Sequence, residues 1–68
     1  MKIKVSSFDL QLLRLFADGF SDEQVARKLN LPWSRLDESK RSLYRRIGEN
    51  DPLKALHILA RKGFTIED

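Results

Sequence analysis

The stretch SDEQVARKLNLPWSRL, from Ser21 to Leu36, decides the fold. Its first half has apolar residues at helical spacing, and Ser21 followed three residues later by Gln24 is typical of a capping box at a helix start. Asn30 tolerates the left-handed turn that ends a helix, and Pro32 can open a second one. Two helices joined by so short a turn predict a helix-turn-helix, which places its second helix in the DNA major groove.

Similar start and stop signals lie on both sides of this stretch. Ser6 stands three residues before Asp9, and Asp51 precedes Pro52, as at helix starts. A glycine follows three of the apolar periodic segments, where it permits the closing left-handed turn: Gly19, Gly48 and Gly63. No alternating β-branched run predicts a strand. The sequence therefore predicts one all-α domain over residues 1–68, a compact four-helix domain with a central helix-turn-helix and helices at about 7–18, 22–29, 33–47 and 52–62.

Composition narrows the classes of function. The 68 residues suit one small domain, and the absence of cysteine excludes disulfides and thiolate metal sites. A single histidine, no glycine-rich phosphate loop and no nucleophile–base set predict no catalytic residue, metal site or cofactor. No apolar run approaches the roughly 18 residues that a membrane span needs, and the start does not resemble a signal peptide, so we expect a cytoplasmic protein without a membrane partner. The net charge of +3 is small, so the placement of charge matters more than its total.

Three blocks of the chain match one family in register. They are LLRLFADGFSDEQVARKLNL (12–31), the segment from Leu43 to Gly48, and KALHILARKGF (54–64). Together they resemble the LuxR/GerE-type helix-turn-helix domain of bacterial transcription regulators. The resemblance implies a four-helix domain that binds double-stranded DNA and acts as a homodimer through its last helix.

The helix predicted at 33–47 has two faces. One should face the core, with Trp33, Leu36, Leu43, Tyr44 and Ile47. The opposite face would enter the major groove and carries Ser34, Asp37, Glu38, Arg41 and Arg45. Arg35 near the helix start and Ser21 at the start of the preceding helix complete the candidate DNA-binding residues. We assign base recognition to Arg41, phosphate contacts to Arg35 and Arg45, and free backbone amides to the helix start near Ser21. The segment from Arg27 to Arg46 contains seven basic residues and only two acidic ones, a local excess of positive charge that suits binding to a polyanion.

Three residues of this helix depart from the family pattern. Asp37 and Glu38 are acidic where the family has a lysine and a small or polar residue. They either pair with Arg41 along the helix or accept hydrogen bonds from cytosine. The alternative function is a helix-turn-helix-fold protein-interaction module that binds another regulator or RNA polymerase, with DNA binding weakened by the two acids. Lys40 lies in the core-facing arc, so its stem should pack while its head reaches water, and Lys40→Val should stabilise the domain.

The last predicted helix has an unusually wide apolar arc. Part of it must pack against the first helix, and the rest would be covered by a second copy. The expected dimerisation residues are Leu53, Leu56, His57 and Ile58. The alternatives are a surface histidine and ordinary exposed apolar area. Trp33 is assigned to the core, with stacking on DNA or on a partner as the alternative. Further core positions are Phe8, Leu12, Leu13, Phe16, Phe20 and Phe64.

Overall fold

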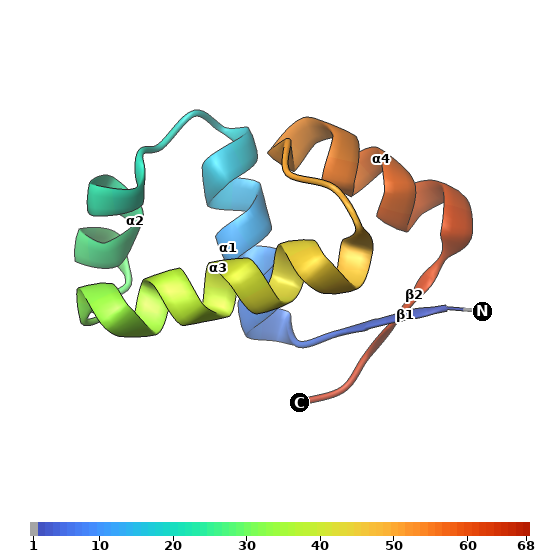
Figure 1. The fold of residues 1–68 in the computed structure, drawn as a ribbon, viewed down its shortest axis with the longest axis horizontal. Coiled ribbons are helices and arrows are strands. Elements are labelled where there is room, and N and C mark those ends of the chain that lie inside the picture. Colours follow the sequence, from blue (N-terminus) through green and yellow to red (C-terminus); the bar gives the residue numbers. More distant parts are fainter. Residues whose placement is uncertain (1) are drawn as a thin grey trace.

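Four helices make up most of the chain in the computed structural model, which describes residues 2–68 (Figure 1). The elements, in chain order, are β1 (Ile3–Val5), α1 (Ser7–Ala17), α2 (Asp22–Lys28), α3 (Trp33–Ile47), α4 (Pro52–Lys62) and β2 (Phe64–Ile66). This confirms the predicted helical fold class, and each helix boundary lies within one residue of the prediction.

The helix ends confirm the capping signals. The Ser6 side chain accepts a hydrogen bond from the Asp9 amide, and the Asp9 carboxylate accepts one from the Ser6 amide. Ser21 and Gln24 form the same reciprocal pair at α2. The side chain of Asp51 accepts a bond from the Leu53 amide at the start of α4. Local sequence therefore explains where three of the helices begin.

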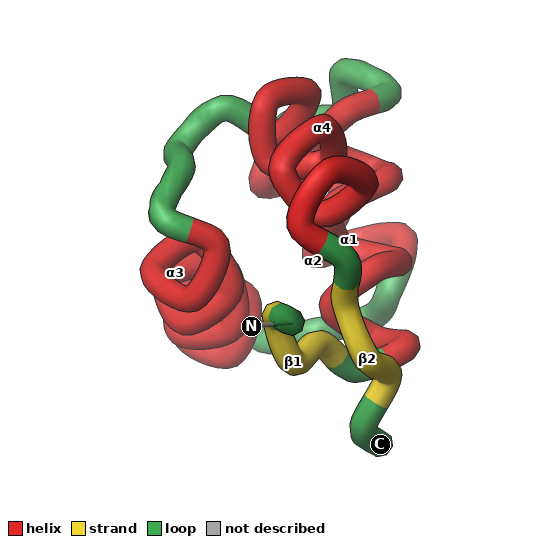
Figure 2. The backbone as a smooth tube through the Cα atoms, turned by 90° about the vertical axis from the view of Figure 1, so that its right-hand side faces the viewer, coloured by secondary structure: helices red, strands yellow, loops and turns green. Residues whose placement is uncertain are grey.

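The two chain ends form a small parallel sheet that the sequence did not predict. The strands β1 and β2 lie side by side (Figure 2), with Ile3 opposite Phe64 and Val5 opposite Ile66 in the register. In addition, the Ser7 amide and hydroxyl donate to the Asp68 carboxylate at 2.7 and 2.8 Å, and these bonds lower the pKa of Asp68. Three-residue strands are too short for an alternating pattern to stand out, and their partner lies about sixty positions away in the chain.

The buried side chains form two clusters. The main core joins β1, α1, the C-terminal half of α3 and α4, through Val5, Leu13, Leu43, Tyr44, Ile47, Ala55 and Leu59. The helix-turn-helix core joins α1, α2 and the N-terminal half of α3, through Leu12, Phe16, Val25 and Leu36. Phe8 and Phe20 pack against this second cluster, as expected. The assignment of Phe64 to the core was wrong: it is 38% exposed at the edge of the small sheet, beyond the buried clusters.

Candidate nucleic-acid interface

A tight turn connects α2 to α3. The residue Asn30 adopts the left-handed conformation with φ of 53°, as the sequence predicted. The Leu31 amide then donates back to the Ala26 carbonyl at 2.9 Å, and α3 begins directly after Pro32. The side chains of Val25 and Leu36 are fully buried in one cluster, so their packing fixes the orientation of α3 relative to α2. Ser34 lies inside α3 and caps nothing.

The outer face of α3 presents most of the predicted DNA-binding residues to solvent. Exposed side chains on this helix include Ser34, Arg35, Glu38, Arg41 and Arg45. Among residues 2–68, neither Arg35 nor Arg45 has an ion-pair partner. Asp37 is half-buried and pairs with Arg41, whose Nε lies 3.2 Å from the Asp37 carboxylate. The structure thus supports the interpretation of Asp37 as an intrahelical partner, whereas Glu38 makes no ion pair in the described residues.

Two further basic residues of α3 are directed away from this face. Lys40 reaches α2, where its Nζ lies 2.8 Å from a carboxylate oxygen of Asp22. The same ammonium sits 4.8 Å from the centre of the Phe16 ring. Its stem therefore crosses apolar surface as predicted, but its head binds an acidic residue that the sequence analysis did not assign to it.

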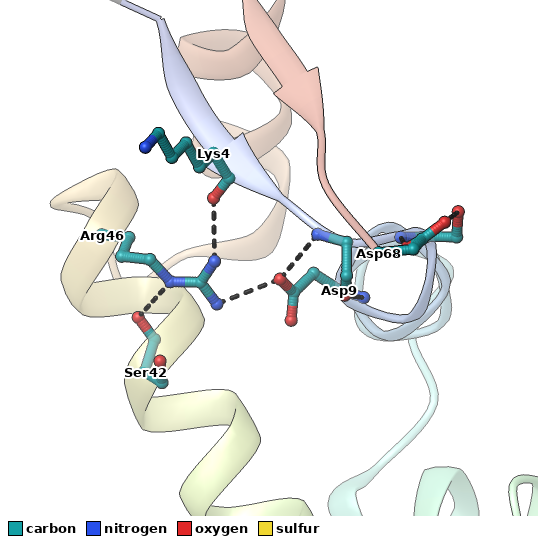
Figure 3. Close-up of polar contacts among 7 residues, drawn as sticks. Lys4, Asp9, Ser42, Arg46 and Asp68 are labelled. Atoms are coloured by element: carbon teal, nitrogen blue, oxygen red, sulfur yellow. Dashed lines mark hydrogen bonds and ion pairs between the residues drawn. The ribbon is translucent and has the colours of Figure 1, made fainter.

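Arg46 is held at the centre of three elements (Figure 3). Its Nη1 donates to the Lys4 carbonyl of β1 at 2.8 Å, and its Nη2 donates to the Asp9 carboxylate of α1 at 3.0 Å. Its Nε donates to the Ser42 carbonyl, one turn earlier on α3, at 3.2 Å. The Asp9 side chain is only 10% exposed and the Arg46 side chain is 38% exposed, so the carboxylate is nearly buried while the guanidinium is partly in contact with solvent. Sequence reasoning missed it because the capping role of Asp9 gave no sign of a second partner 37 positions away.

A groove of about 550 Å³ lies beside the outer face, between α3 and the loop to α4. Its lining mixes both signs of charge and includes Lys40, Arg41, Arg45, Asp37, Glu49 and Tyr44. Burial raises the pKa of Tyr44 above its ordinary value, and the nearby charges of Asp22 and Asp51 raise it further. The backbone amides of Asn50 and Asp51 donate to Glu49 and lower its pKa, so Glu49 stays negative at neutral pH.

The start of α2 offers less to an anion than the sequence suggested. The Ser21 amide donates to the Gln24 side chain at 2.9 Å, and the Gln24 amide donates to the Ser21 hydroxyl at 3.2 Å. Asp22 and Glu23 add negative charge in the first turn. Because two amides are already bonded there and the turn is acidic, Ser21 is the weakest member of the predicted set.

The assignment of Trp33 to the core was wrong. The side chain is 58% exposed at the first position of α3. On a helical wheel Trp33 lies in the same arc as Leu36. At the first position of α3, however, Trp33 belongs to neither of the two buried clusters. The other four residues predicted for the inner face, Leu36, Leu43, Tyr44 and Ile47, are buried.

The expected dimerisation residues of α4 divide into two groups. Leu53 is 57% exposed, and His57 is exposed beside it in a groove that also includes Ile58 and Arg61. Leu56 and Ile58 are half-buried and pack against the main core. The unpartnered apolar area of α4 is therefore centred on Leu53.

Within residues 2–68, no three His, Cys, Asp or Glu side chains are grouped so that they could hold a metal ion. None of the helices in this range is long and apolar enough to cross a membrane.

Comparisons with protein-family models, curated proteins and solved structures find no match to this chain. The resemblance to LuxR/GerE-type domains therefore rests on the residues of the segments 12–31, 43–48 and 54–64.

Proposed function

We propose that this chain is a LuxR/GerE-like transcription regulator that binds a specific double-stranded DNA sequence through the outer face of α3. The observation that carries the proposal is that, in the described part of the chain, some arginines of α3 have no acidic partner while others are paired. Arg35 and Arg45 are exposed without acidic partners among residues 2–68, directly after the short turn that would present α3 to a groove. Arg41 lies between them in sequence and is tied only by an exposed pair to Asp37, which phosphate or guanine can replace.

The proposal includes the homodimer that the sequence implies, through α4. Leu53 and His57 lie together on the exposed side of that helix and support it. A two-fold dimer would place two copies of α3 on half-sites one helical turn of DNA apart.

The test is fluorescence anisotropy of a labelled random-sequence duplex at two salt concentrations. We expect the affinity to weaken as salt rises. The slope of the logarithm of the binding constant against the logarithm of salt concentration should become shallower by about one in Arg35→Ala and in Arg45→Ala. Arg14→Ala is the matched control, because Arg14 is an exposed arginine on α1 and its removal changes the net charge equally. If all three variants bind as the parent chain does, or if the parent chain binds neither random duplex nor any selected sequence, the DNA-binding proposal is wrong.

The exposure of Trp33 favours the second candidate, a module that binds another regulator or RNA polymerase. Tryptophan is enriched among the residues that contribute most to binding in protein interfaces, and Trp33 is 58% exposed. Asp37→Lys separates the two functions. It should strengthen or redirect DNA binding in a DNA-binding protein, and it should leave DNA binding negligible in a protein-interaction module.

A further inference from the structure

The outer edge of β2 has main-chain groups without partners. On its inner edge, the Ile3 amide donates to the Gly63 carbonyl at 3.2 Å, and the Glu67 amide donates to the Val5 carbonyl at 2.8 Å. Main-chain groups alternate in direction along a strand, so the amides and carbonyls of Phe64 and Ile66 are directed away from β1. Within residues 2–68 nothing pairs with them.

The side chains on this strand are also uncovered. All three residues of β2 are exposed, and Phe64 and Ile66 are 38% and 54% exposed although both are large and apolar. The register places them on the same face of the sheet as Ile3 and Val5. An exposed apolar edge strand is a template for pairing with another strand.

We propose that β2 pairs antiparallel with β2 of a second copy of this chain, with Thr65 opposite Thr65. In this register each Phe64 lies opposite an Ile66, and the two residues exchange main-chain hydrogen bonds. Opposed residues share a face, so Phe64 of one copy covers Ile66 of the other. The two threonines meet on the opposite face as a close pair without main-chain bonds between them, which is a favourable arrangement for threonine.

Charge decides both the direction of pairing and the nature of the partner. The segment around β2 reads RKGFTIED, with Arg61 and Lys62 before the strand and Glu67 and Asp68 after it. Antiparallel pairing brings the basic end of one copy to the acidic end of the other. Parallel pairing would align like charges, which is unfavourable. The segment is therefore complementary to itself, and a second copy fits this edge. The main-chain pairing of the contact involves β2 and does not include Leu53 or His57 of α4, and it does not depend on DNA binding.

Disulfide trapping tests the register directly, because the chain has no cysteine of its own. In the proposed pair the two Thr65 Cα atoms lie about 4.5 Å apart, within the range that a disulfide spans. Thr65→Cys should therefore form covalent dimers under mild oxidation. Ser34→Cys is the matched control, because Ser34 is a small, uncharged and exposed residue at the start of α3, far from β2 and outside the proposed contact (Figure 1). We expect the Thr65→Cys chain to cross-link at least about tenfold faster.

A second measurement uses the unmodified protein. Exchange of the Phe64 and Ile66 amides should slow as protein concentration rises, because these amides become bonded only in the dimer. The Leu53→Lys substitution, which disrupts the α4 face, should change neither this protection nor the cross-linking of Thr65→Cys. Equal cross-linking of the two cysteine variants, unprotected Phe64 and Ile66 amides at high concentration, or loss of both signals in Leu53→Lys would each overturn the proposal.

Discussion

The inner and outer sides of α3 carry the same kind of residue with opposite consequences. Arg45 and Arg46 are adjacent in sequence, and both are in contact with solvent, although the Arg46 side chain is only 38% exposed. Arg46 donates to Asp9, Lys4 and Ser42 and holds α3 against α1 and β1. Arg45 makes no ion pair within residues 2–68. One arginine stabilises the fold, and its neighbour is available to a ligand.

The difference shows that a count of basic residues overstates how many of them are available to bind a ligand. Seven basic residues lie between Arg27 and Arg46, but Lys40 and Arg46 are bound to acids of other elements. Arg27 and Arg41 pair within their own helices, and their side chains are 75% and 74% exposed. Exposed pairs of that kind are weak, so those two arginines can exchange their partners for phosphate, whereas Arg46 cannot do so without loss of stability.

The largest expected effect comes from breaking the inner side. Arg46→Ala leaves the Asp9 carboxylate nearly buried without its cation, and we expect the free energy of unfolding to fall by about 2 kcal/mol, less than for a fully buried pair because Arg46 is partly exposed. In a domain of this size the melting temperature should drop on the order of 10 °C. Arg45→Ala, measured by the same thermal unfolding, should change stability by less than about 0.5 kcal/mol. Similar losses in the two variants would contradict the division between the two sides.

The next effect concerns the outer side. Asp37→Asn removes a negative charge from the proposed DNA-binding face and releases Arg41. We expect the affinity for duplex DNA to rise by roughly three- to tenfold at low salt, and the gain should shrink as salt is added. Asp18→Asn makes the same change of net charge on an exposed residue outside α3 and should have little effect. An equal gain in both variants would mean that total charge matters and the position of Asp37 does not.

The signals that could be interpreted from sequence were local ones. The capping pairs of Ser6 with Asp9 and of Ser21 with Gln24, and the left-handed turn at Asn30, join residues within a few positions, and they fixed the helix boundaries. The Arg46–Asp9 pair and the β1–β2 sheet join residues far apart in the chain, so no spacing rule indicated them. The prediction that Trp33 lies in the core was wrong for a related reason. A helical wheel gives the direction of a side chain around the helix axis, but it does not show whether another element lies beside it.

Lys40 gives a smaller effect whose sign differs from the sequence-based expectation. Valine at this position cannot reach Asp22 or the Phe16 ring, and its branched Cβ is less favourable in a helix. We therefore expect Lys40→Val to lower the free energy of unfolding by about 0.5–1 kcal/mol, since the pair is about one-third exposed and only modestly strong. Asp22→Asn, which removes the other partner, should have a similar effect in urea unfolding. A stabilised Lys40→Val variant would show that burial of the stem outweighs the ion pair, as the sequence alone suggested.

The smallest effect is a dependence of stability on alkaline pH through Tyr44, on the inner side of α3. Burial raises its pKa above the ordinary value of 10.0, so the folded chain holds the phenol proton more tightly than the unfolded chain does. The stabilisation is therefore complete below pH 10 and is lost as pH rises through the higher pKa of the folded state. Tyr44→Phe lacks this proton, so urea unfolding from pH 8 upward should show the parent chain losing stability relative to the variant only above about pH 10. Parallel curves for the two chains would mean that the phenol is equally solvated in both states, and the close packing of Tyr44 against the main core would then be wrong.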